Sequence, residues 1–137
     1  MKTRPELTLA DCEKITAAAQ AEARRNHWIV SIAILDGGGH LLHFVRMDGA
    51  SPASVAISVD KARTAAMTRR ASGMWEERVK QGRISMLVMP GILPVQGGVP
   101  IVVEGSCVGG VGVSGVQSHE DEQIAQAGID ALDGKTS

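Results

Sequence analysis

Aromatic residues are almost absent from this 137-residue chain, which has two tryptophans, one phenylalanine and no tyrosine. Proteins that bind single strands of nucleic acid stack bases on aromatic side chains, and binding to any nucleic acid favours a surplus of positive charge. Here the formal net charge is -1. The composition therefore argues against a nucleic-acid partner and predicts a core built from aliphatic side chains.

Cysteine and long apolar runs are also scarce. Cys12 and Cys107 lie far apart and form no CxxC pair, so we expect two reduced thiols in a cytoplasmic protein. The N-terminus lacks the apolar stretch of a secretory signal, and no apolar run is long enough to cross a membrane. No repeat or linker divides the chain, whose length predicts a single domain over 1–137.

The spacing of apolar residues predicts an α/β chain of the α+β kind. Helices are expected over about 8–26, 51–70, 74–80 and from 118 onward, the first opened by a capping box of Thr8 and Asp11. Strands are expected over 28–35, 40–47, 84–89, 99–103 and 107–115. Tight turns join two pairs of these strands, so we expect one antiparallel sheet of about five strands, flanked by helices.

Two of the expected strands indicate close packing against other elements. The strand at 28–35 is apolar on both faces, so a second surface must cover it, and in a short chain that surface could belong to another subunit. In the strand at 107–115, Gly110 and Gly112 point to one side, where a helix, a ligand or another backbone must come close. The GxGxxG pattern here lies inside a strand near the C-terminus, which argues against a dinucleotide site.

Candidate site residues follow the second strand. Arg46, Lys61 and Arg70 could form a cationic pocket mouth that binds carboxylates. The alternative is a solvated helix face together with a turn clamp between Arg46 and Asp48. His40 and His43 point to opposite faces of a strand, so no metal site is expected from them.

Several separated motifs occur together: IAILDGGGHLLHFVRMDGASPAS, DKARTAA and GGVPIVVEGSCVGGVGVSG, followed by a D-E-x-x-A-x-A-G-I helix. From about Leu9 to Leu132 the chain resembles the GlcG/HbpS-like family of haem-binding or haem-degrading proteins, which is related to the C-terminal domain of PduO-type corrinoid adenosyltransferases. The resemblance implies a profilin-like or PAS-like fold and a homo-oligomer, with an octamer as the expected form. It also implies haem as the cofactor.

The resemblance further implies a pocket between subunits. The F-V-R-M-D-G-A segment that carries Arg46 would rim this pocket. The segment 68–72 matches a stretch whose hydroxyl group contacts iron in a haem-binding relative, and Ser72 stands where relatives have threonine. The expected ligand-binding residues are therefore Arg46, Lys61, Arg70, Ser72, Gly97 and Gly98.

Two functions of different kinds follow from these observations. The first is a cytoplasmic oligomer that binds haem for its handling or breakdown, with propionates held by Arg or Lys. The alternative is an enzyme of small-molecule catabolism, in which Arg46 or Lys61 binds a carboxylate and Asp48, His119 or Glu120 moves a proton. An accessory subunit of a catabolic operon is a third reading.

Overall fold

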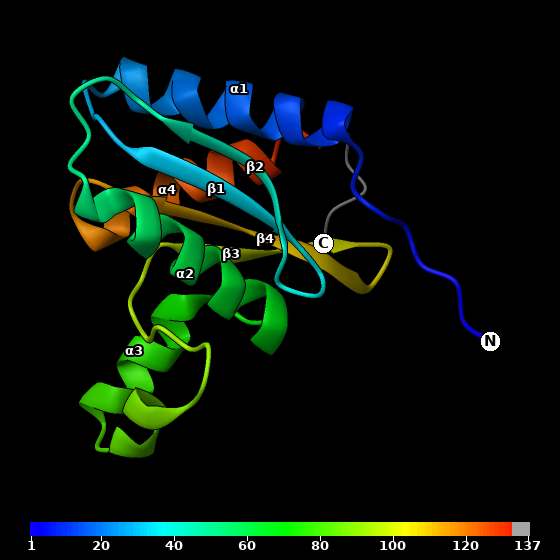
Figure 1. Ribbon diagram of the computed structural model, residues 1–137, viewed down its shortest axis with the longest axis vertical. Helices are drawn as coiled ribbons and strands as arrows, with labels where there is room; N and C mark the ends of the chain where they lie inside the picture. The colour runs from blue at the N-terminus through cyan, green and yellow to red at the C-terminus, as the bar shows by residue number, and fades with distance from the viewer. Residues whose placement is uncertain (133–137) are drawn as a thin grey trace.

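The structure, a computed structural model, describes residues 1–132. Four α-helices, one 3-10 helix and four strands follow one another along this part of the chain (Figure 1). In order, they are α1 (Leu9–Arg25), β1 (Ser31–Asp36), β2 (Leu41–Arg46), α2 (Ala53–Thr68), α3 (Ser72–Lys80), η1 (Ile84–Val88), β3 (Gly98–Val103), β4 (Ser106–Ser114) and α4 (Ser118–Ile129). The Thr8–Asp11 capping box at the start of α1 is confirmed.

The four strands form one antiparallel sheet in the order β2-β1-β4-β3. The mixed helix and strand architecture is as expected, but the sheet has four strands among the described residues and not five. The expected strand at 84–89 is instead the 3-10 helix η1. Met86 of this segment is buried, but Ile84, Leu87 and Val88 are 69%, 60% and 82% exposed. A β-rich composition without a neighbouring strand to pair with does not make a strand.

Helices cover both faces of the sheet. In Figure 1, α1 and α4 lie on one side of the strands and α2 lies on the other. The larger core cluster joins Ile15 of α1 and Ile124 of α4 to Ile32 and Ile34 of β1, all completely buried. The smaller cluster, Ala33, Leu35 and Ala62, lies under α2. A second surface does cover β1, as expected, but it is α2 of the same chain and not another subunit.

Helix α2 packs very close to β4. A Cβ atom on Gly112 would lie 2.0 Å from the carbonyl oxygen of Ser58, and one on Gly110 would lie 2.5 Å from that of Ala62. The buried face of α2 consequently carries small residues at four-residue spacing, including Ser54, Ser58 and Ala62. The larger side chains Val55 and Val59 of the same helix are only half-buried. Small groups on both elements allow the backbones to approach.

Helix α3 and η1 form an arm, residues 72–89, that projects away from the sheet below α2 (Figure 1). The segment that follows the arm ties it to the body, since the Leu93 N–H donates to Thr64 Oγ1 of α2 at 2.7 Å. Gln96 makes two further links: its N–H donates to Glu76 of α3 at 3.2 Å, and its side-chain amide donates to Glu122 of α4, also at 3.2 Å. The arm is thus fixed at its base while its apolar tip remains exposed.

Candidate functional site

A buried ion pair joins α2 to α4 at one end of the sheet. The Lys61 ammonium donates to Asp121 Oδ2 at 3.0 Å and to the Val113 carbonyl at 3.0 Å. Asp121 also accepts the Val116 N–H at 3.1 Å. Both residues are 2% exposed. Every charged atom of this pair therefore has a partner inside the protein, and the pair fixes α4 against α2 and β4.

Burial raises the pKa of the Asp121 carboxyl, although the charge of Lys61 and its hydrogen bond act in the opposite direction. The loss of hydration of Asp121 thus outweighs the attraction to its partner. A buried pair of this kind specifies geometry more than it adds stability, because desolvation offsets most of the Coulombic gain.

Three other expected site residues gather beside Lys61. Ser72, the first residue of α3, is completely buried, and its Oγ accepts the Gly98 N–H at 2.8 Å. A Cβ on Gly98 would lie 2.1 Å from the Lys61 carbonyl oxygen, and a Cβ on Gly97 would lie 2.7 Å from the Lys61 ammonium nitrogen. Lys61, Ser72, Gly97 and Gly98 therefore form one buried cluster at the base of the arm.

Arg46 lies apart from that cluster. It ends β2 at the edge of the sheet, and its Nε and Nη2 donate to the carbonyl of Ala50 at 3.1 and 2.8 Å. It is therefore a turn clamp, but its partner is the Ala50 backbone and, among the described contacts, not Asp48. Arg46 and Asp48 both line an open groove of about 350 Å³ together with Arg24 and Gln20 of α1.

The sheet register explains why the expected ligand residues divide into two groups. Arg46 pairs with Ser31 and Gly98 pairs with Gly112, so both residues lie near the same end of the sheet. They belong to opposite edge strands, however, three strand spacings apart. That separation is about 14 Å at the usual spacing of neighbouring strands. One small ligand therefore does not contact both groups within one chain.

The remaining acid–base candidates lie in the first turn of α4. Glu120 forms a capping box with Gln117, whose N–H donates to Glu120 Oε1 at 3.1 Å. Gln117 is therefore the capping residue of α4. His119 beside it is exposed, as is Asp48 in the turn after β2. No described contact joins Asp48 to His119 or Glu120, so the three candidates do not form a catalytic group within one chain.

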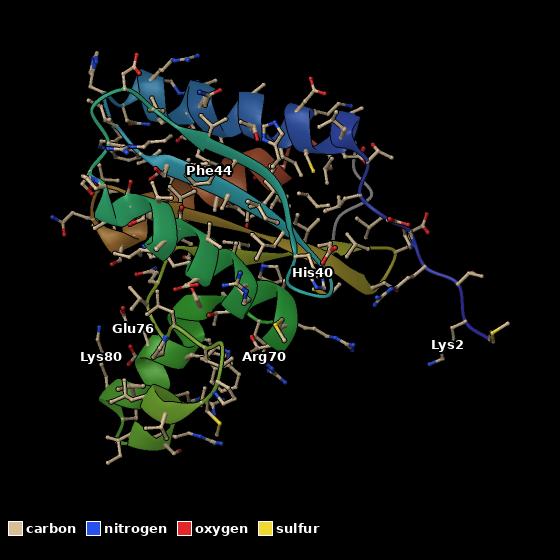
Figure 2. All side chains as sticks on the ribbon, viewed as in Figure 1. Lys2, His40, Phe44, Arg70, Glu76 and Lys80 are labelled. Carbon is tan, nitrogen blue, oxygen red and sulfur yellow. The ribbon has the colours of Figure 1, made fainter. Side chains whose placement is uncertain are left out.

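The histidines of the described chain are dispersed. His40 lies in the turn between β1 and β2, beside Asp36 (Figure 2). His43 lies on the face of β2 that meets α1, where its Nδ1 and Thr16 Oγ1 of α1 are 3.0 Å apart. Within residues 1–132, no three His, Cys, Asp or Glu side chains gather in a way that could hold a metal ion.

The tip of the arm carries the most conspicuous apolar surface. Besides Ile84, Leu87 and Val88, Met89 is 41% exposed, and Met67 at the end of α2 is 55% exposed. Figure 2 shows Arg70 between the end of α2 and the arm. We call Ile84, Leu87, Val88 and Met89 the arm-tip patch. An exposed apolar surface suits an amphipathic ligand or a second protein surface.

Sequence reasoning missed two of these features. Asp121 was not among the expected site residues, because nothing local connects it with Lys61, sixty positions earlier along the chain. The sequence did contain one signal for the ion pair: Lys61 is the single lysine of α2 and lies at the border of its small-residue face. The arm-tip patch was missed because its apolar run reads as a buried strand.

No helix in the described part of the chain combines the length and the apolar character needed to cross a membrane. Both Cys12 and Cys107 are free thiols, as expected.

Comparison with known proteins agrees with this architecture. The chain is 47% identical over 114 residues to Protein GlcG of Escherichia coli K12, which covers 83% of this chain and 85% of GlcG. A double mutant of HbpS from Streptomyces reticuli superposes with a TM-score of 0.88 at 34% identity, covering 97% of this chain and 91% of that one. A PduOC:heme complex superposes with a TM-score of 0.86 at 27% identity, covering 97% of this chain and 100% of that one.

The family model described as "Haem degrading protein HbpS-like" matches residues 7–130, which include every helix and strand described above. The chain therefore belongs to the HbpS-like family of haem-degrading proteins.

Proposed function

We propose that this protein is a cytoplasmic oligomer that binds haem against the arm-tip patch, with a second subunit closing the site. The observation that carries the proposal is the exposed apolar tip of a firmly anchored arm, in a fold shared with a haem complex. Val88 is 82% exposed beside the exposed side chains of Leu87 and Ile84. A contiguous exposed apolar patch of this kind marks a surface that binds a ligand or another protein. The free thiols Cys12 and Cys107 support a reducing compartment.

The residues present fit the chemistry of haem. The macrocycle is apolar and would lie against Leu87 and Val88. Its propionates carry negative charge and would pair with Arg70, which is exposed and is not engaged by any described side chain. When bound, haem would supply a redox-active iron.

Ser72 and Lys61 would position the arm and would not touch the iron. Ser72, which matches the iron-contacting hydroxyl of a relative, is buried and holds the Gly98 backbone in this chain. Lys61 is likewise enclosed by Asp121. Met89 on the arm and Met67 near the end of α2 are both exposed, so their thioethers would be available to hold the iron.

A titration with haemin tests the proposal. A Soret band that shifts and saturates at micromolar haemin is expected for the native protein. Leu87→Glu should weaken binding because it places charge against the macrocycle, and Arg70→Gln should weaken it through loss of a propionate partner. Arg25→Gln on α1 is the control and should bind as the native protein does.

A flat Soret response would reject haem binding and favour the second candidate, an enzyme or accessory protein acting on a carboxylated metabolite. A specific observation supports that candidate: Arg24, Arg46 and Asp48 line one groove, which places cations and a carboxylate together. In that case Arg46→Lys should lower affinity for the metabolite, because lysine keeps the charge and loses the planar fork.

A further inference from the structure

A separate cavity lies on the side of the molecule that carries the N-terminal segment. It has a volume of about 630 Å³ and lies between the N-terminal segment, the β3–β4 turn and the residue that ends α2. Figure 2 shows Lys2 on the N-terminal segment, well away from the arm. The volume is within the range of small-molecule sites, which is about 300–1,000 Å³.

The charge in this cavity has one sign. Lys2, Arg4 and Arg69 line it, and its lining contains no acidic side chain. Within the described residues, none of these three cations forms an ion pair or a hydrogen bond through its side chain. Cations gathered around a concavity concentrate positive potential inside it and attract anions.

Backbone strain at Arg69 is an independent observation on the same cavity. Arg69 ends α2 in the left-handed conformation, with φ 60° and ψ 28°. Glycine is the usual residue at this position of a helix end, because a Cβ atom makes the conformation unfavourable. Arg69 also lines the cavity, and residues held in sparsely populated backbone conformations cluster at ligand sites.

We propose that this cavity binds a small metabolite carrying at least two carboxylate or phosphate groups. Lys2 and Arg4 on one side and Arg69 on the other can each contact a different oxyanion group. Two arginines offer paired N–H donors that match the geometry of carboxylate or phosphate oxygens. The site is independent of haem, since it uses none of Arg70, Met67 or the arm-tip patch.

Calorimetric titration with pyrophosphate and with citrate, at low ionic strength, tests this site. The two anions distinguish a preference for phosphate groups from a preference for carboxylate groups. Saturable binding of either anion supports the proposal and identifies the preferred group. Affinity should fall as salt is added, because the cations are exposed. Failure of both anions to bind overturns it.

Arg69→Gly is the decisive variant because it should separate function from folding. The substitution removes one charge-assisted contact to the anion, so anion binding should weaken about tenfold or more. Its melting temperature should stay the same or rise, since glycine relieves the strained backbone. Arg78→Gln, which removes one exposed cation from α3, is the matched control. Equal affinity in Arg69→Gly and the native protein, or an equal loss in Arg78→Gln, contradicts the proposal.

The Cys107 thiol provides a second readout, since it lines the same cavity while Cys12 is 1% exposed. Alkylation by iodoacetate converts the thiolate to a thioether and releases iodide. The bound anion should slow this reaction at Cys107 severalfold, and Cys107→Ser should abolish the labelling. Labelling at the same rate with and without saturating anion would place the anion elsewhere and overturn the assignment.

Discussion

At the scale of single residues, the buried ion pair of Lys61 and Asp121 controls how well the fold tolerates substitution. Each charge is enclosed, and each depends on the other for compensation. Removing one partner leaves an uncompensated buried charge, which is much less favourable than having no charges at all. The pair is therefore a point of high sensitivity although its net contribution to stability is small.

We predict that Asp121→Asn lowers the free energy of unfolding by about 3–5 kcal/mol, the usual effect of orphaning one member of a buried pair. Asparagine keeps an acceptor for the Val116 N–H but does not neutralise the Lys61 ammonium. Adding Lys61→Met should recover part of the loss, because the orphaned charge is then gone. Urea unfolding measures both effects, and Asp130→Asn at the exposed end of α4 is the control. A double variant less stable than Asp121→Asn alone would show that the charge was not the cause.

At the scale of elements, the contact between α2 and β4 is closer than ordinary side chains permit. Gly110 and Gly112 face Ser58 and Ala62, so backbone meets backbone across the interface. Neither element can yield, because α2 is also held by the Lys61 pair and β4 lies in the interior of the sheet. The small residues at this interface therefore set the distance between α2 and the sheet.

We predict that Gly112→Ala is among the most destabilising single substitutions in the chain. Its Cβ would lie 2.0 Å from the Ser58 carbonyl oxygen, so α2 must move. Overpacking of this kind typically costs about 1–3 kcal/mol, and occasionally more. Thermal unfolding compared with Gly37→Ala tests this, since the nearest atom to a Cβ at Gly37 is 3.4 Å away. Equal melting temperatures for the two variants would contradict the close approach of α2.

The β1–β2 turn provides a pH-dependent prediction. Partial burial acts to raise the pKa of Asp36, but hydrogen bonds from the N–H groups of His40 and Gly38 outweigh it and lower that pKa. A carboxyl with a lowered pKa stabilises the fold above its unfolded value of 3.8, and this contribution is lost as pH falls through the folded value.

Asp36→Asn should therefore be less stable than the native protein near neutral pH, and the difference should shrink as pH falls below about 3.8. Asparagine keeps the acceptor oxygen, so the variant isolates the effect of charge. Urea unfolding at a series of pH values measures the difference. A gap that stays constant or widens in acid would contradict the role given to Asp36.

At the scale of the whole molecule, the arm-tip patch is an apolar surface that the described chain does not cover. The second face of β1 no longer argues for a partner, since α2 covers it. The argument for assembly now depends on Ile84, Leu87 and Val88, which are exposed on a projecting arm. An interface there would also provide the enclosure that a bound haem requires.

We predict a homo-oligomer larger than a dimer, with an octamer as the expected form. Light scattering should give a mass well above that of two 14.4 kDa chains. Val88→Glu should reduce the mass without lowering the stability of the subunit, because the side chain is already in solvent. Glu77→Gln on the exposed part of α3 is the control. A native mass near 14.4 kDa at micromolar concentration would reject assembly.

The sequence by itself determined the helices, four of the five expected strands and the glycine-lined face of β4, because these depend on local periodicity and on side-chain size. Only the tertiary structure decided which elements and side chains come into contact. Local pattern cannot show that Lys61 pairs with Asp121, that Arg46 clamps Ala50, or that Lys2, Arg4 and Arg69 share a cavity. The run 84–88 became a 3-10 helix because no neighbouring strand lies beside it to supply hydrogen bonds. Long-range partners are set by how the layers pack, and this information is distributed over the whole chain.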